Sequence, residues 1–219
     1  MNIELTSSNF REICIGKISE NTLYRSSHPI VDYKQDSDIA AKATKAGIRT
    51  IINLSDTDDE MKKKAAFAPW YRKLVIKKSA IAVSIRYGIF SKNYREKFKD
   101  AIQFMLSHER PYIVHCEAGI DRTGFMTMIL GAYMGASLKE IAADHLSSFY
   151  EDCERELKYG ILFIQNAFCK LNNEIPVTEL MTQSIAENYL IHDIGLGENE
   201  MKLLKEKLSE PLNPQALHQ

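Results

Sequence analysis

Residues 115–124, His115-Cys116-Glu117-Ala118-Gly119-Ile120-Asp121-Arg122-Thr123-Gly124, decide the fold and the chemistry of this chain. The run Pro111-Tyr112-Ile113-Val114 before them is short, apolar and rich in β-forming residues, which predicts a buried parallel strand. The run Phe125–Met134 after them predicts a buried helix. These ten residues, called the Cys116 loop below, therefore join the end of a strand to the start of a helix.

A loop in this position is suited to binding an anion. Free backbone N–H groups and the positive end of the helix dipole meet there. The same field favours the thiolate of Cys116, and Arg122 offers a planar fork that can hold two oxygens of one phosphate. Gly119 allows the backbone to approach an anion closely, and Gly124 allows tight helix packing. The alternative is a buried structural cysteine beside an arginine that caps a helix.

The pattern resembles the phosphate-binding loop of the cysteine-dependent protein tyrosine phosphatase superfamily, His-Cys-x-x-Gly-x-x-Arg-Thr-Gly. The segments 9–12 and 24–26 are also similar to segments of the atypical bacterial tyrosine/lipid phosphatases. The resemblance is strong in the loop and weak elsewhere. Two interpretations of Arg25 stay open: a surface arginine on an edge strand, or a residue near the substrate.

The resemblance implies a phosphomonoester hydrolase that acts through a phosphocysteine intermediate. Cys116 would be the nucleophile and Arg122 the catalytic arginine. The loop residues expected to bind the phosphate are Glu117, Ala118, Gly119, Ile120, Asp121 and Arg122. His115 would orient the loop, and the Thr123 hydroxyl would either donate to the sulfur or serve only in the first helical turn. No metal or cofactor is expected.

The sequence differs from the commonest family pattern in the residues expected to supply the general acid. Ordinary tyrosine phosphatases carry it in a Trp-Pro-Asp loop, but the corresponding residues 77–90 contain no carboxylate. Asp100 falls on the polar side of a predicted helix. Asp121 is the close candidate, because atypical bacterial phosphatases and myotubularin lipid phosphatases use an aspartate at this position; otherwise it merely caps the helix. The fallback candidates are Asp56, Asp58 and Asp59.

Strands and helices alternate through the middle of the chain, which predicts an α/β fold. We expect a central, mostly parallel sheet with helices on both faces, a cysteine-phosphatase fold and a helical C-terminal part. Strands are predicted at residues 13–18, 23–27, 48–54, 74–76 and 112–115. Helices are predicted at 36–46, from the acidic run 55–60 through 67, and at 91–106, 137–150, 156–171, 176–194 and 198–208. One domain would span residues 1–210, with a disordered tail at 211–219.

Composition restricts the partners. The chain has 219 residues and a formal net charge of −1, so charge gives no reason to expect nucleic acid or a membrane surface. The N-terminus has no signal-peptide pattern, and no apolar run is long enough to span a bilayer. The four cysteines are scattered, which predicts neither a zinc site nor a disulfide framework. We expect a cytoplasmic protein, or one exported without an N-terminal signal.

Several functions fit these observations. We expect a protein tyrosine or dual-specificity phosphatase, in which free phosphate or sulfate could also occupy the loop. The alternatives are a phosphoinositide or inositol polyphosphate (phytase-like) phosphatase, a catalytically dead phospho-binding module, and an arsenate reductase or rhodanese. Glu117 beside the nucleophile disfavours a polyanionic ring, whereas Lys77, Lys78 and Arg86 in the facing segment could supply the missing charge. The start His-Cys-Glu-Ala-Gly also resembles the phytase-like branch. We expect phosphotyrosine peptides to be cleaved fastest.

Overall fold

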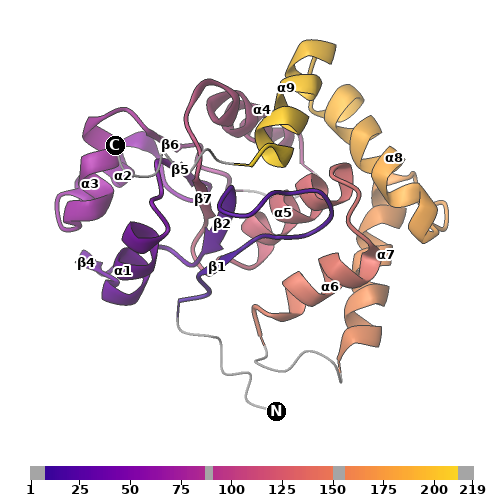
Figure 1. The fold of residues 1–219 in the computed structure, drawn as a ribbon, viewed down its shortest axis with the longest axis horizontal. Coiled ribbons are helices and arrows are strands. Elements are labelled where there is room, and N and C mark those ends of the chain that lie inside the picture. Colours follow the sequence, from indigo (N-terminus) through magenta and orange to yellow (C-terminus); the bar gives the residue numbers. More distant parts are fainter. Residues whose placement is uncertain (1–7, 87–90, 150–155, 212–219) are drawn as a thin grey trace.

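A five-stranded sheet forms the centre of the fold (Figure 1). The computed structural model describes residues 8–86, 91–149 and 156–211. The strand order is β1 (Arg11–Glu12), β2 (Leu23–Ser26), β7 (Tyr112–His115), β5 (Thr50–Asn53) and β6 (Ala80–Ala82). Only β1 runs antiparallel to its neighbour. A separate two-stranded ribbon joins β3 (Ile30–Val31) and β4 (Lys34–Gln35). The predicted mostly parallel sheet is confirmed.

Helices cover the sheet on both faces. On one side lie α1 (Ser37–Lys45), α2 (Asp58–Ala65) and α3 (Pro69–Ile76), at the left of Figure 1. The other side carries α4 (Lys92–Ser107), α5 (Asp121–Tyr133), α6 (Leu138–Leu146), α7 (Leu157–Leu171), α8 (Thr182–Asn188) and α9 (Glu198–Ser209). A 3₁₀ turn at Glu179–Met181 precedes α8, and a π-helical turn at Tyr189–Asp193 follows it.

The central strand β7 shows why the sheet needs both layers. Tyr112 and Val114 pack into the core beneath α4 and α5, whereas Ile113 between them packs into the core beneath α1–α3. Successive side chains of a strand point to opposite faces, so an apolar run without alternation must be covered on both.

Several predicted helix boundaries are confirmed. The Ser91 side chain accepts the first N-terminal hydrogen bond of α4, from the Tyr94 N–H. The apolar face of α4 is fully buried, as its spacing predicts; it consists of Tyr94, Phe98, Ala101, Ile102 and Met105. Ser137 and Glu140 form the expected capping box of α6. Gly47 follows α1 with a positive φ of 63°.

Two strand predictions are wrong. Residues 13–18 form no strand, because Gly16 adopts a positive φ of 58° and turns the chain against the backbone of Ala136. Residues 74–76 belong to α3, which starts at Pro69 in the first helical position. A three-residue apolar run carries no period that separates strand from helix. The edge strand next to β5 is Ala80–Ala82 instead.

Helical predictions in the C-terminal half need smaller corrections. The helix expected from residue 176 begins only with the 3₁₀ turn at Glu179, and α6 ends at Leu146 rather than near 150. Tyr150 and residues 212–219 of the predicted tail lie outside the described residues. Within the described ranges no helix is long and apolar enough to cross a membrane.

The carboxyl ends of the parallel strands meet at one edge of the sheet. Ser26, His115, Asn53 and Ala82 are the last residues of their strands, and they stand in register across the sheet. In sheets of this kind ligands bind at this edge. The Cys116 loop leaves it from the central strand β7.

Candidate active site

The Cys116 loop has the strand–loop–helix geometry that the sequence predicts. Cys116 follows β7 directly and is 2% exposed. Helix α5 begins at Asp121, and among the described residues no side chain caps its first turn. The amide groups at the start of α5 are therefore left to a ligand or to water.

The loop carbonyl groups are held from behind by residues of the N-terminal segment. The backbone N–H of His28 donates to the Glu117 carbonyl at 2.9 Å. The Asn9 side chain donates to the carbonyls of Ala118 at 3.3 Å and Gly119 at 3.1 Å. Since the C=O and N–H groups of a trans peptide point in opposite directions, the N–H groups of these peptides point away from the N-terminal segment.

Arg25 makes a further contact of this kind. Its Nη2 donates to the Gly119 carbonyl at 2.6 Å, and its Nη1 forms an ion pair with Asp144. Arg11 holds the same carboxylate, with 2.8 Å between Nε and Oδ1. Arg25 is fully buried, so its interpretation as a surface arginine is wrong. Burial alone would raise the pKa of Asp144, but the two guanidinium groups lower it, which keeps the carboxylate charged.

The backbone N–H groups of residues 117–120 have no hydrogen-bond partner among the described residues. Gly119 makes this curl possible through a positive φ of 71°, and a Cβ at this position would lie 2.3 Å from the Ser26 carbonyl oxygen. Backbone N–H groups that are unpaired within the described residues can bind an anion, as successive amide groups do in known anion sites.

Arg122 is anchored to the segment that faces the loop. Its Nη1 donates to the Ile85 carbonyl at 3.0 Å, and its own carbonyl accepts from the Tyr94 hydroxyl at 3.0 Å. Arg86 follows Ile85, but its guanidinium group pairs with Glu60 of α2 at 3.7 Å. Lys77 and Lys78 do not face the loop. Lys77 lines a pocket at the other end of the sheet, and the Lys78 carbonyl contacts His108 there.

His115 is fully buried and joined to a hydrogen-bond chain that sequence reasoning missed. Asn53 Nδ2 donates to the Tyr71 hydroxyl at 3.1 Å, and this hydroxyl lies 3.0 Å from His115 Nε2. Since the hydroxyl oxygen accepts from Asn53, the hydroxyl can donate its own proton to Nε2 of a neutral His115. Burial, reinforced by His28, lowers the pKa of His115 well below its ordinary value, so the ring is neutral. This arrangement favours an orienting role.

Asp56 belongs to a second buried cluster. His28 Nδ1 accepts from the Ile30 N–H at 3.0 Å, so His28 Nε2–H donates to Asp56 Oδ2 at 2.8 Å. Lys64 Nζ donates to Oδ1 at 2.8 Å. Burial would raise the pKa of Asp56, but the bonds from His28 and Lys64 outweigh it and hold the pKa well below its usual range. A carboxylate held in its ionised form is a poor proton donor.

The other acidic candidates differ in their surroundings. Asp58 pairs with Lys62, and Asp59 is exposed in the first turn of α2. Asp100 pairs with Lys97 on the outer side of α4, at 3.2 Å. Asp121 is exposed at the first position of α5, and its side chain makes no capping bond. Of the candidates, only Asp121 is part of the Cys116 loop.

Asp121 also borders a cleft between α5, α6 and α7. The cleft is lined by Ile120, Asp121, Gly124, Phe125, Met128, His145, Phe163, Ile164 and Ala167. The His145 and Phe163 rings stack with their centroids 4.7 Å apart, and Phe163 is 57% exposed. Burial lowers the pKa of His145, and the nearby Arg25 lowers it further. The wall next to Asp121 is therefore largely apolar and aromatic.

The Thr123 hydroxyl and the described cysteines other than Cys116 differ in burial. Thr123 is fully buried, and its hydroxyl has no partner among the described residues, so a bond to the Cys116 sulfur, one of its two possible roles, is not formed here. Cys14 is exposed and Cys169 half-buried, whereas Cys153 lies outside the described residues. Partial burial and the neighbouring Glu12 raise the pKa of Cys14 to about 12, which makes this thiol unreactive.

A family model described as "Tyrosine phosphatase family" matches residues 6–210. A Cupriavidus necator protein named "Putative tyrosine-protein phosphatase" is 39% identical over 64 residues, which are 28% of this chain and 22% of that protein's length. The chain thus spans about a fifth of this relative.

Two solved structures are more distantly similar. One is the core catalytic domain of the Saccharomyces cerevisiae PP-IP phosphatase SIW14, with 17% identity and a TM-score of 0.43 over 77% of this chain and 94% of that one. The other is Pseudomonas aeruginosa TpbA, with 14% identity and a TM-score of 0.46 over 83% of this chain and 92% of that one.

Proposed function

The chain belongs to the tyrosine phosphatase family, and from this premise we propose that it hydrolyses phosphate monoesters through a phosphocysteine intermediate on Cys116. The Cys116 thiolate attacks phosphorus as the bond to the leaving oxygen breaks. Asp121 gives that oxygen its proton. Water then attacks the phosphocysteine, the thiolate leaves, and the product is inorganic phosphate.

One observation carries this proposal: hydrogen bonds hold the carbonyls of residues 117–119, while the N–H groups of residues 117–120 have no partner among the described residues. Donors fixed in advance stabilise charge on the transferring phosphoryl group without reorganising during the reaction. Arg122 adds a charged fork at the same helix N-terminus. Its present bond to the Ile85 carbonyl leaves other guanidinium donors for the substrate.

Asp121 is our choice for the general acid. It is accessible to a substrate, whereas Asp56 is buried and held ionised by His28 and Lys64. A general acid must hold a proton at working pH and reach the leaving oxygen. The Thr123 hydroxyl is buried beside Arg122 and has no partner among the described residues, so it is available to the sulfur when the thiolate leaves in the second step.

For the substrate we propose a phosphotyrosine-containing protein, with dual specificity as the broader possibility. Glu117 places a negative charge next to the nucleophile, which disfavours a densely phosphorylated ring. Lys77 and Lys78 lie at the other end of the sheet and cannot offset that charge. The aromatic wall of His145 and Phe163 beside Asp121 suits an aromatic leaving group.

The test compares kcat/KM for phosphotyrosine peptides, phosphoserine peptides and inositol hexakisphosphate. We expect the phosphotyrosine peptide to be cleaved fastest, and Glu117→Lys to shift the ratio toward the inositol substrate. Phe163→Ala should raise KM for phosphotyrosine several-fold. Tyr159→Ala is the matched control, since Tyr159 is an exposed aromatic residue on the same helix outside the cleft.

A wild-type preference for inositol hexakisphosphate would replace this assignment with a phytase-like one. Binding of phosphopeptides without turnover of any ester, including activated aryl phosphates, would identify a catalytically dead binding module. Equal effects of Phe163→Ala and Tyr159→Ala on KM would show that the aromatic wall takes no part in substrate recognition.

A further inference from the structure

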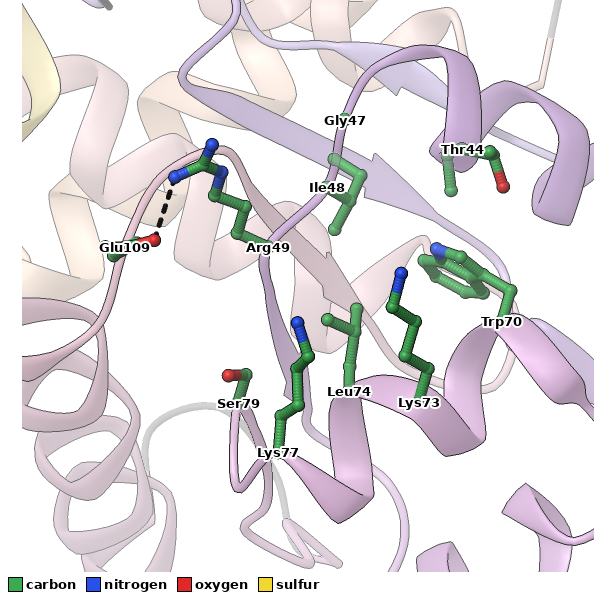
Figure 2. A pocket seen from close by; sticks show the side chains of 11 residues that line it. Thr44, Gly47, Ile48, Arg49, Trp70, Lys73, Leu74, Lys77, Ser79 and Glu109 are labelled. Carbon is green, nitrogen blue, oxygen red and sulfur yellow. Dashed lines mark hydrogen bonds and ion pairs between the residues drawn. The ribbon is translucent and has the colours of Figure 1, made fainter. Parts of the chain in front are cut away.

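A pocket of about 470 Å³ opens at the edge of the sheet opposite to the Cys116 loop (Figure 2). Arg49 directly precedes β5, Ser79 directly precedes β6, and Glu109 lies just before β7. These are the amino ends of parallel strands whose carboxyl ends carry the candidate active site. A four-residue strand spans about 13 Å, so the pocket and the Cys116 loop are separate places.

Two lysines that have no carboxylate partner among the described residues line this pocket. Lys73 lies on α3, and Lys77 is the residue directly after its last turn. Both lysines are exposed, and Figure 2 shows their side chains pointing the same way along the pocket, with Leu74 between them. Neither forms an ion pair within the described part of the chain. The third cation, Arg49, is already bound to Glu109 at 2.9 Å. The net charge facing the pocket is therefore positive, in a chain whose overall formal charge is −1.

Placing Lys73 and Lys77 close together destabilises the fold when no ligand is bound. Like charges one helical turn apart repel each other by a few tenths of a kcal/mol. The C-terminal end of α3 favours a nearby cation, yet it gives no reason for two ammonium groups to enter one hollow. An anion bound between them would remove the repulsion.

The remaining lining supplies an apolar surface for the body of a ligand. Trp70, the chain's single tryptophan, is half-buried and lies beside Lys73, with Leu74 and Ile48 deeper in the pocket. The flat indole face can stack on a planar ring. A pocket of this volume is in the range of small-molecule sites.

We propose that this pocket binds a small organic phosphate with a planar ring, of which a nucleoside diphosphate is the representative chemistry. The ring stacks on Trp70, and the phosphates lie between Lys73 and Lys77. Such a ligand would occupy the protein independently of a substrate in the Cys116 loop.

Trp70 makes the test direct, because all tryptophan fluorescence comes from the proposed site. ADP is titrated into the full chain carrying Cys116→Ser, so that no ester is consumed. We expect a saturable change in fluorescence. Lys73→Gln and Lys77→Gln should each weaken binding about tenfold or more, as the loss of one charge-assisted hydrogen bond does.

Three controls separate this site from other causes. Arg72→Gln removes a charge from the same helix at an exposed position outside the pocket and should leave the affinity unchanged. Arg122→Lys should also leave it unchanged, since it alters only the Cys116 loop. Inorganic phosphate should bind more weakly than ADP.

Four results would overturn the proposal. They are the absence of a saturable change, equal weakening by Arg72→Gln, loss of binding in Arg122→Lys, and equal affinity for inorganic phosphate. Equal weakening by Arg72→Gln would show diffuse charge attraction only. Loss of binding in Arg122→Lys would show that ADP binds in the Cys116 loop. Equal affinity for inorganic phosphate would show that the pocket does not recognise the ring.

Discussion

Arg25 donates to the Gly119 carbonyl oxygen at 2.6 Å, although the two residues are 94 positions apart in the chain. The contact joins the second strand to the turn of the Cys116 loop. Arg25 is in turn fixed by Asp144 of α6. The shape of the loop is therefore maintained by distant residues as well as by its own glycine.

Arg25→Lys should lower kcat/KM strongly while the free energy of unfolding changes little. An ammonium group can still pair with Asp144, but it cannot also reach Gly119, because it lacks the planar fork. We expect a loss of about ten- to a hundredfold in kcat/KM, measured with an aryl phosphate. Arg25→Met should also lower the free energy of unfolding by about 3–5 kcal/mol, since it weakens the charge balance of buried Asp144. Wild-type kcat/KM in Arg25→Lys would refute this role.

Tyr71→Phe should reduce kcat about tenfold and destabilise the fold by about 1–3 kcal/mol. The change removes the hydroxyl that links Asn53 to His115 and leaves His115 Nε2 unpaired in the interior. Tyr112→Phe is the matched control. Tyr112 is equally buried in the strand that carries His115, but its hydroxyl donates to Met105 at 2.8 Å. Similar kcat losses in both variants would show a general effect on stability only.

Asp121→Asn should separate substrates by their leaving groups. A poor leaving oxygen needs a proton, so its kcat should fall by about 10²- to 10⁴-fold. An activated aryl phosphate should be affected much less. Equal losses for both kinds of substrate would move the acid role elsewhere and reopen the case for Asp58 and Asp59.

Stability should decline as pH falls below about 6.5. Burial lowers the pKa of His115 and His145. The unfolded chain therefore takes up protons in a range where the folded protein does not, and the decline continues down to the lower folded pKa values. Each histidine contributes up to about 1.4 kcal/mol per pH unit. Urea unfolding at a series of pH values should show this slope, and His145→Gln should reduce it. A flat profile from about pH 7 to about pH 5 would disprove the assignment.

Local sequence signals predicted the elements that carry the candidate site. The strand before Cys116, the turn at Gly119 and the start of α5 follow from residue types within ten positions. The Ser91 and Ser137 caps were equally predictable, because capping is a contact between near neighbours.

The supports of the loop could not be predicted in the same way. Asn9, His28 and Tyr71 reach the Cys116 loop or His115 only through the order of strands in the sheet. A single sequence carries no local signal for that order. The failed strand at residues 74–76 has a similar cause, because a short apolar run fits a buried helix as well as a buried strand.

The most direct test measures turnover of an aryl phosphate by Cys116→Ser beside Cys14→Ser. Both changes replace one sulfur with oxygen, but Cys14 is exposed and its pKa is raised to about 12. We predict that Cys116→Ser abolishes turnover yet still binds the ester, that Cys14→Ser keeps wild-type kcat, and that a chelator has no effect. Turnover that survives Cys116→Ser, or that is lost with the chelator, would contradict cysteine-based catalysis.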